Sequence, residues 1–456
     1  MTKQILVSFE GEGSGVGDMT WGQADIWAAM QRESSSLSIG GAFPLPPGTT
    51  VDDVAADLRF IMCRNASLRT RLRYDGGRLQ QVAVATGEIA LEVIDPGGAD
   101  PGAVAAQVYA RYSGKVFDHF REWPILWAVV ARDGAATHFV SVISHLATDG
   151  MGTLAMLADM DRRDPATGAA GPVTAAQPLE LAAREAAPSA RRQSAVALAY
   201  WERTLRAIPA RRWTPSAAGP CRPRYWQATY DSPAALSAAQ VLAARTGVTT
   251  STVLLAAWAI ALSRVTGVSP AVIQVVVNNR FRRGLADVVS PLCISIPAVI
   301  DTTGPFDPVV ARAWRAAINA YKLSYYDPAD REKLIARIEH ERGEPIDISC
   351  FVNDRRITIS HEPVDGSLPV AADLLAALPR STLTWGKQQD LPRERCFLHV
   401  NDVADSLCVE FWADTRYVSP ATMEACLRGL ETVLIAAVLD PVADPGAGAD
   451  TSVRVP

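Results

Sequence analysis

A histidine at position 145 is the residue best placed for chemistry in this sequence. It stands where an apolar, strand-like stretch, residues 138–144, gives way to a turn that contains Thr148, Asp149 and Gly150. Side chains at such strand ends often face a cleft that a ligand can reach. A neutral imidazole, with an ordinary pKa of about 6.5, accepts a proton from an amine or alcohol that attacks a carbonyl. A strand-end histidine is more often a structural residue, so position alone favours the structural role.

Asp149 lies four residues after His145 and directly before Gly150. A carboxylate buried at this point requires a cationic partner or several N–H donors. It could face His145 and orient the ring, or point away and brace the loop. We favour the bracing role.

Several other kinds of site are not expected. The six histidines, at 119, 138, 145, 340, 361 and 399, include no pair with metal-ligand spacing, so we expect no metal site. A Ser hydrolase elbow, G-x-S-x-G, is absent. The seven cysteines form no C-x-x-C pair and mostly lie in apolar runs, which is typical of buried thiols in a reducing compartment.

Composition and charge disfavour two further classes of binding partner, nucleic acids and membranes. The formal net charge is −5 and there is no long basic run, which disfavours nucleic acid as a partner. The most apolar stretch, residues 253–262, is about half as long as a membrane span, and the N-terminus lacks the features of a signal peptide. We therefore expect a cytoplasmic protein without membrane contact.

The hydrophobic pattern alternates between strands and helices in two halves of the chain. Strands over 125–130 and 138–144 lead to His145, and a helix over 153–160 follows it. Thr20 and Gln23 form a capping-box pattern at the start of a helix. Residues 162–194, rich in Ala, Pro, Gly and Arg, are predicted to be a linker. The expected architecture is α/β, with lobes at 1–175 and 176–440 and a disordered tail at 441–456.

The stretch Ser144-His-Leu-Ala-Thr-Asp-Gly150 resembles the His-His-x-x-x-Asp-Gly signature of condensation domains of nonribosomal peptide synthetases, relatives of chloramphenicol acetyltransferase. Five further stretches resemble motifs of that family in the same order along the chain: Thr20–Trp27, Leu68–Leu72, Ala199–Trp201, Asn279–Leu292 and Ser349–Asn353. The resemblance implies two chloramphenicol-acetyltransferase-like lobes in a V-shaped pseudo-dimer with a tunnel between them.

The resemblance also implies roles for individual residues. His145 matches the histidine that positions or deprotonates the acceptor nucleophile. Asp149 and Arg280 match a structural salt bridge. Gly150 matches a glycine that lets the backbone approach the reacting carbonyl, and Asn353 matches a residue that lines the tunnel.

The chain departs from the family pattern at three positions. Ser144 replaces the first motif histidine. Ser295 stands near a lost asparagine and is expected to take over its role. Asn279 replaces the glycine before Arg280. These changes predict an outlying member of the family with an unusual substrate.

The function implied by the resemblance is that of a free-standing, monomeric condensation enzyme of secondary metabolism. It would transfer an acyl or aminoacyl group from the phosphopantetheine thioester of an acyl or peptidyl carrier protein, acting in trans, to a small amine or alcohol. The protein itself would need no metal or organic cofactor. Two alternatives stay open: a non-catalytic module that recruits another enzyme to a synthetase, and an acyl-CoA-dependent acyltransferase of the same fold.

Overall fold

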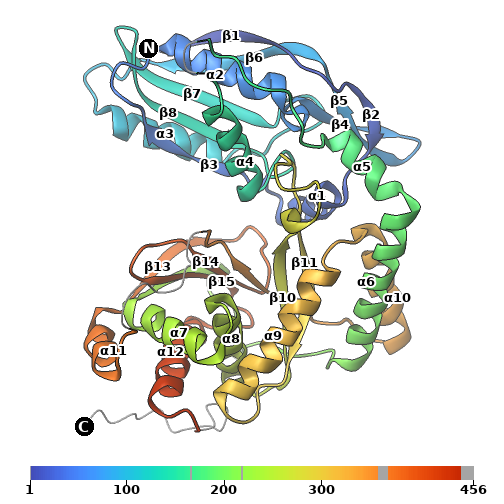
Figure 1. The fold of residues 1–456 in the computed structure, drawn as a ribbon, viewed down its shortest axis with the longest axis vertical. Coiled ribbons are helices and arrows are strands. Elements are labelled where there is room, and N and C mark those ends of the chain that lie inside the picture. Colours follow the sequence, from blue (N-terminus) through green and yellow to red (C-terminus); the bar gives the residue numbers. More distant parts are fainter. Residues whose placement is uncertain (1, 165–166, 217–218, 358–367, 443–456) are drawn as a thin grey trace. The chain divides into compact units, whose positions relative to one another are not determined.

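The chain is organised into two compact units, each with its own sheet and core. The computed structural model describes residues 2–164, 167–216, 219–357 and 368–442. Unit 1 comprises Met1–Gln193, Asn278–Ile294 and Tyr326–Ala329, and unit 2 comprises Ser194–Val277, Ser295–Tyr325 and Asp330–Pro456. Figure 1 shows the elements of both units in chain order.

Unit 1 is built on a five-stranded sheet of order β1-β6-β7-β8-β3. The strands are β1 (Thr2–Glu10), β6 (Thr86–Ile94), β7 (Ile125–Arg132), β8 (Ala135–Ile143) and β3 (Ile39–Pro44). Alternate side chains point to opposite faces. One face packs with helix α2 (Val51–Arg64) and with Met156 of α4 (Gly150–Asp161), whereas the other packs with α3 (Pro101–Ser113).

The hairpin of β7 and β8 delivers the motif loop. Its turn contains Asp133 and Gly134, both at positive φ, and the two strands pair in antiparallel register as far as Ile125 opposite Ile143. Val140 and Val142 of β8 are fully buried in the hydrophobic cluster that contains Ala105, Val108 and Tyr112 of α3. The strand therefore fixes the point at which Ser144 leaves the sheet.

A smaller sheet and a capped helix complete this unit. The sheet has the order β2 (Gly15–Asp18), β5 (Arg78–Ala83) and β4 (Thr70–Asp75). Helix α1 (Trp21–Glu33) begins at Thr20, whose side chain accepts from the N–H of Gln23 while the Gln23 side chain accepts from the N–H of Thr20. The predicted capping box is thus confirmed.

The prediction of a linker over residues 162–194 was wrong in its second half. Helix α5 (Pro178–Ala186) and the start of α6 (Pro188–Ala207) lie there. Each helix has a proline at its first position, where a missing N–H costs nothing, and Ala, Glu and Arg then favour the helix. The buried Glu185 carboxylate accepts a hydrogen bond of 2.8 Å from the N–H of Trp21, so α5 also fixes the start of α1.

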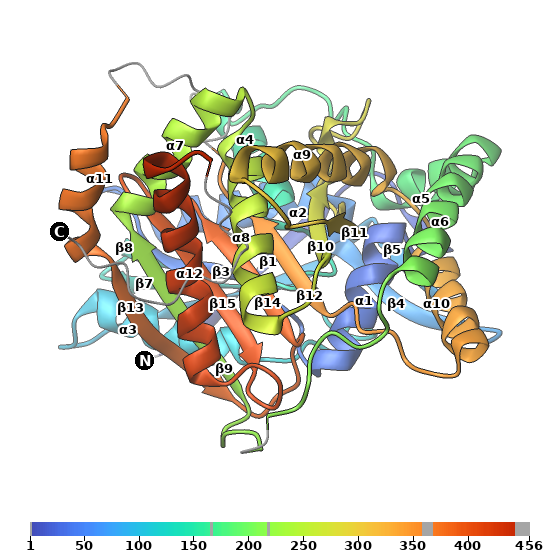
Figure 2. The same cartoon turned by 90° about the horizontal axis from the view of Figure 1, so that it is seen from below.

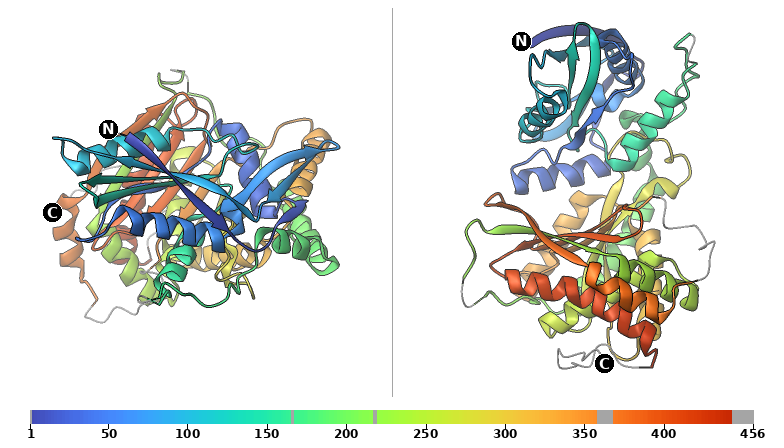
Figure 3. Two further views of the ribbon diagram at one scale, coloured as in Figure 1. Left: turned by 90° about the horizontal axis from the view of Figure 1, so that it is seen from above. Right: turned by 90° about the vertical axis from the view of Figure 1, so that its left-hand side faces the viewer.

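Unit 2 is built on a seven-stranded sheet of order β11-β10-β12-β14-β15-β9-β13. The strands are β9 (Tyr225–Ser232), β10 (Ala271–Asn278), β11 (Cys293–Ile300), β12 (Cys350–Asp354), β13 (Thr382–Gln389), β14 (Cys396–Asn401) and β15 (Leu407–Asp414). Helices α7 (Pro233–Thr246), α8 (Thr250–Thr266), α9 (Phe306–Leu323) and α12 (Pro420–Leu439) contribute to one core with one face of this sheet. Figure 2 shows α8 and α12 across the strands, and the right view of Figure 3 shows α12, in red, along one side of the sheet.

The contact-defined units differ from the lobes expected at 1–175 and 176–440. Residues 178–193 and 278–294 lie in unit 1, and the boundary falls within α6. The second of these segments belongs to unit 1 because of the contacts around Asp149 described below. The structure also contains helices α10 (Pro328–Arg342) and α11 (Ala371–Ala377) and three short 3-10 helices, Ala66–Arg69, Asn279–Phe281 and Leu378–Arg380. Most of the tail predicted at 441–456 lies outside the described residues.

Among the described residues, no single helix is long and apolar enough to cross a membrane. The pair α7 and α8 meets the length and composition criteria together, with a bend of 110° between its helices. The side chains of α8 from Val253 to Leu262 are buried in the core of unit 2.

Candidate active site

The motif loop leaves β8 after Ile143 and is held by backbone hydrogen bonds. The N–H of Ser144 donates to the carbonyl of Pro124 over 2.8 Å, and the N–H of His145 donates to the carbonyl of Ser36 over 3.2 Å. Asp149 then caps α4, since its carboxylate accepts from the N–H of Gly152 over 2.8 Å. The loop is therefore pinned at both ends.

The His145 ring is half-buried and its tautomer follows from its partner. Nδ1 lies 2.9 Å from the carbonyl oxygen of Thr148. A carbonyl can only accept, so Nδ1 carries the proton in the neutral ring and Nε2 carries the lone pair. Nε2 is thus the atom of His145 that can accept a proton.

Ser144, in the place of the first motif histidine, is fully buried. Its hydroxyl oxygen accepts from the N–H of Leu146 and lies 2.7 Å from Nε2 of His119. Burial lowers the pKa of His119, although a hydrogen bond to the backbone of Phe117 opposes this shift. The Ser144 hydroxyl and His119 Nε2 are hydrogen-bonded to each other, and the tautomer of His119 decides which of them donates. The side chain of Ser144 is therefore committed to His119.

Asp149 is buried and forms a salt bridge with Arg280. Arg280 Nη1 lies 2.8 Å from Asp149 Oδ1 and 2.9 Å from Oδ2, and the N–H of Leu292 donates to Oδ2 over 2.8 Å. Burial alone would raise the pKa of Asp149, but the charge and hydrogen bonds of Arg280, with the N–H groups of Leu292 and Gly152, outweigh burial and lower it. The carboxylate is ionised and braces the loop through its bonds to Arg280, Leu292 and Gly152.

Arg280 in turn organises the segment that follows it. Its Nη2 donates to the carbonyls of Val288 and Ser290, each over 2.9 Å, and its Nη1 donates to Asn278 Oδ1 over 3.2 Å. The planar guanidinium suits this set of in-plane acceptors, which a lysine could not satisfy together. Residues 278–294 are thereby tied to α4.

Cys293 lies at the end of this segment. Burial first, and then the Asp149 carboxylate, raise the pKa of its thiol well above the ordinary value. A thiol that stays protonated is a poor nucleophile. Cys293 is therefore a poor candidate for a nucleophile.

Two glycines at the start of α4 have different surroundings. A Cβ added to Gly150 would meet no heavy atom within 4 Å. A Cβ added to Gly152 would lie 2.4 Å from Thr148 Oγ1 and 2.8 Å from Arg280 Nη2. Gly152 is thus required by packing, whereas Gly150 borders open space at the helix start.

Ser295 and Asn353 belong to unit 2, so the structure does not bring them together with His145 within one unit. Ser295 Oγ donates to Gln274 Oε1 over 3.0 Å, and Gln274 Nε2 donates to the carbonyl of Ile348 over 3.1 Å. Asn353 is half-buried on β12 and lies opposite His399 of β14. Their roles toward a substrate remain predictions.

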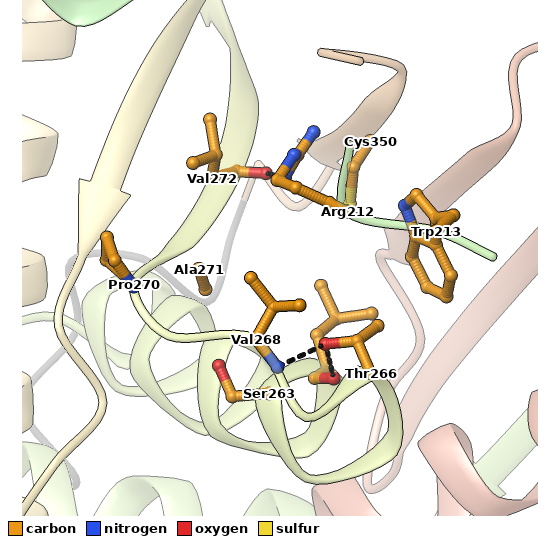
Figure 4. Close-up of a pocket in the computed structure, with 10 residues that line it drawn as sticks. Arg212, Trp213, Ser263, Thr266, Val268, Pro270, Ala271, Val272 and Cys350 are labelled. Atoms are coloured by element: carbon orange, nitrogen blue, oxygen red, sulfur yellow. Dashed lines mark hydrogen bonds between the residues drawn. The ribbon is translucent and has the colours of Figure 1, made fainter. Parts of the chain in front are cut away.

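The described residues also include a cavity distant in sequence from the motif loop. It has room for about one water molecule, about 20 Å3, and lies in unit 2 beside Arg212, Trp213 and Cys350 (Figure 4). Arg212 donates to the carbonyls of Asp347 and Val272, so its charge is used in holding the chain. Within the described ranges no group of three or more His, Cys, Asp or Glu side chains is arranged to hold a metal ion.

Sequence reasoning missed His119 and Gly152. His119 has no distinctive neighbours in the sequence, and its bond to Ser144 joins segments 25 residues apart. A signal for Gly152 was present, since a second glycine two residues after Gly150 is unfavourable inside a helix unless packing requires it.

Comparison with known proteins identifies the family. The model of the condensation domain family matches residues 21–326. Search of curated proteins gives no match. The chain belongs to the condensation domain family, whose members are acyltransferases that form amide or ester bonds from carrier-bound substrates in secondary metabolism. The predicted family is confirmed.

Solved structures share the fold. One structure is reported for condensation domain-mediated chain release from the enacyloxin polyketide synthase. Its sequence is 22% identical, and the match covers 97% of this chain and 86% of that chain, at a TM-score of 0.71. A mutant starter condensation domain of rhizomide synthetase RzmA in complex with C8-CoA is 16% identical. The match covers 95% of this chain and 97% of that chain, at a TM-score of 0.69. A third structure is that of SgcC5 from Streptomyces globisporus in complex with (R)-(-)-1-(2-naphthyl)-1,2-ethanediol and sucrose. It is 17% identical, and the match covers 94% of this chain and 100% of that chain, at a TM-score of 0.68. The predicted α/β fold with two sheet-containing lobes is confirmed.

Proposed function

We propose that this protein is a condensation enzyme that transfers an acyl or aminoacyl group from a carrier-protein phosphopantetheine thioester to an amine or alcohol. His145 is the catalytic residue. The observation that carries the proposal is the bond between His145 Nδ1 and the Thr148 carbonyl, because it leaves the lone pair on Nε2.

The reaction then needs a group that accepts the proton of the nucleophile and later donates it to the leaving thiolate. The acceptor nitrogen or oxygen attacks the thioester carbon while its proton passes to His145 Nε2. Collapse of the tetrahedral intermediate breaks the C–S bond, and the same proton goes to the departing thiolate. The products are an amide or ester and a free phosphopantetheine thiol, so no oxidant, reductant or metal takes part in the balance.

The start of α4 supplies a second element of the proposal. Gly150 is exposed and borders open space, and the first N–H groups of a helix have no partners within the helix. A main-chain N–H at this point could stabilise the developing oxyanion of the intermediate. Asp149 and Arg280 take no part in proton transfer, because their role is to hold α4 and the loop.

Relatives guide the choice of donors and acceptors to test. The RzmA domain is described with C8-CoA, so acyl-CoA belongs in the donor panel beside acyl carrier protein thioesters. SgcC5 is described with an aryl ethanediol, so alcohols belong in the acceptor panel beside amines. We favour a carrier-bound donor and an amine.

Intact-mass spectrometry of the carrier tests the proposal. A carrier protein loaded with defined acyl groups is incubated with the protein and each acceptor, and loss of the acyl mass is matched to formation of product. We expect release that depends on both the protein and an acceptor. Release with acyl-CoA but not with any loaded carrier would favour the acyl-CoA-dependent alternative, and no release with any pair would favour the non-catalytic recruitment module.

A further inference from the structure

The face of the unit 2 sheet opposite its helices carries an ordered set of polar and aromatic side chains. Cys350, Val352, Cys396, Leu398, Val400, Val409 and Phe411 alternate along β12, β14 and β15 into the core with the helices. The residues between them therefore point to the other face. This arrangement places functional groups in rows across neighbouring strands.

Two of these rows lie next to each other. The registers align Asn353 with His399 and His399 with Glu410. The preceding row aligns Phe351 with Phe397, whose ring centroids are 5.2 Å apart. Phe397 also packs against the ring of His399, with centroids 4.1 Å apart. A polar row thus borders an aromatic one.

His399 is 4% exposed, and its Nδ1 has no hydrogen-bond partner among the residues that the structure describes. Burial, and then the charges of Arg355 and Arg393, lower the pKa of this ring well below its ordinary value. The ring is therefore neutral and keeps one N–H donor and one acceptor. A buried imidazole nitrogen without a partner is costly, unless a ligand completes it.

Arg355 follows β12 directly and is open to solvent. Its backbone N–H donates to the carbonyl of Val400, and its side chain makes one long hydrogen bond, 3.4 Å, to Asn401 Oδ1. No carboxylate of a described residue lies within ion-pair distance of it. Partial desolvation, and repulsion from Arg393, lower the pKa of Arg355, although Glu410 opposes them.

The remaining charges do not neutralise Arg355. Glu410 accepts a hydrogen bond of 2.7 Å from Trp412 Nε1, and Arg393 stacks over the Trp412 ring at 4.3 Å. The carboxylate that acts on Arg355 is therefore also hydrogen-bonded to the Trp412 indole. Arg355 itself makes no ion pair with a described residue, and it acts on a neutral histidine that can donate one N–H.

We propose that this face of unit 2 binds an oxyanion carried by a substrate, with Arg355 as the main donor, His399 beside it, and Phe351 and Phe397 against the apolar part of the same ligand. A guanidinium binds a carboxylate or a phosphate through paired N–H donors. The oxyanion is either a carboxylate on the acceptor or the phosphate of the phosphopantetheine arm. The inference rests on the proposed function only in treating the ligand as a substrate.

Binding calorimetry with matched probes tests this site without any turnover. The first pair is 3-phenylpropionate and 3-phenylpropionamide, and the second is 4′-phosphopantetheine and pantetheine. Each pair differs by the anionic group. We expect the anionic member of one pair to bind about tenfold more tightly, as a charge-assisted hydrogen bond implies. Preference in the first pair assigns the carboxylate, and preference in the second assigns the phosphate.

Variants locate the effect. Arg355→Gln should abolish the preference, whereas Arg380→Gln, at an exposed arginine of the same unit, should retain it. Thermal unfolding of both variants checks that they are folded, which the exposure of Arg355 favours. Equal or absent binding of both members in both pairs, or a preference that survives Arg355→Gln, would overturn the proposal. The preference should persist in His145→Ala, so a failure here is distinguishable from a failure of catalysis.

Discussion

Ser144 shows how one residue can depart from the family pattern and keep the loop intact. The hydroxyl that replaces the motif imidazole accepts from the N–H of Leu146 and is hydrogen-bonded to Nε2 of buried His119. The position therefore contributes to packing and hydrogen bonding, while the nitrogen that we propose accepts the proton belongs to the next residue, His145. The replacement of the first motif histidine by Ser144 is therefore compatible with activity, because the bonds of Ser144 to Leu146 and His119 hold the loop.

Removal of the Ser144 hydroxyl tests this interpretation. Ser144→Ala leaves His119 Nε2 buried without its partner, so we expect the free energy of unfolding to fall by about 1–3 kcal/mol. The rate of acyl transfer, measured at a temperature where the variant is folded, should change less than tenfold. A loss of activity as large as that of a His145 variant, with stability unchanged, would contradict this division of roles.

The pair of Asp149 and Arg280 is expected to govern stability. Arg280→Ala strands a buried carboxylate, so we expect the free energy of unfolding to fall by about 3–5 kcal/mol. Arg78 and Asp18 form an exposed pair in the same unit and provide the control. Arg78→Ala should cost about 1 kcal/mol or less. Similar losses from the two arginine variants in urea denaturation would argue against the buried pair.

The same pair has a predictable pH dependence. The pKa of Asp149 is lower in the folded protein than in the unfolded chain, so its contribution to stability is fully present above the unfolded value of about 4 and is lost as the pH falls through the folded value. The difference in unfolding free energy between the wild type and Asp149→Asn should therefore shrink below pH about 4. A difference that stays constant from pH 7 to pH 3 would contradict the lowered pKa.

At the scale of the element, the first turn of α4 combines two tasks. Asp149 caps the helix and binds Arg280, and Gly152 gives that arginine room to approach. Gly150, at the first helical position, leaves space on the open side. The sequence Asp-Gly-Met-Gly is thus explained residue by residue, and its two glycines are not equivalent.

A matched pair of substitutions separates them. Gly152→Ala places a Cβ 2.4 Å from Thr148 Oγ1, and we expect a loss of about 1–3 kcal/mol in the free energy of unfolding. Gly150→Ala meets no atom, so stability should be unchanged or slightly higher. Acyl transfer by Gly150→Ala should nevertheless fall, because the methyl group occupies the space proposed for the reacting carbonyl. Equal stability of the two variants would refute the assignment.

The sequence was informative where the pattern is local. The capping box at Thr20 and the strand that ends before His145 both follow from neighbours along the chain. The bond between Ser144 and His119, and the clash that selects Gly152, could not be predicted because they depend on tertiary contacts. Helix α5 differs from the prediction because Pro and Ala are typical of linkers and of helices alike, and Pro178 stands at the first position of this helix.

At the scale of the whole molecule, the chain does not divide at one point. Residues 278–294 come after the first strands of unit 2 and yet belong to unit 1, because Arg280 and the N–H of Leu292 bind Asp149. One carboxylate thus joins segments more than a hundred residues apart. A domain boundary predicted from composition could not show that residues 278–294 belong to unit 1.

Hydrogen exchange should report this link directly. Asp149→Ala removes the acceptor of the N–H groups of Gly152 and Leu292, each bound over 2.8 Å. We expect both amides to exchange roughly tenfold faster or more. Peptides from β14 and β15 in unit 2 should be unaffected. Protection lost equally in both units, or retained at Leu292, would contradict the account.

The central claim is that His145 accepts the proton of the nucleophile during acyl transfer, and one measurement tests it most directly. Single-turnover release of an acyl group from a loaded carrier is followed by intact mass for the wild type, His145→Ala and the control His138→Ala. His138 lies on β8, the strand that leads to the motif loop. We predict that His145→Ala is folded and slower by about 10²–10⁴-fold, and that His138→Ala is close to the wild type. A folded His145→Ala protein that releases the acyl group at the wild-type rate would contradict the claim.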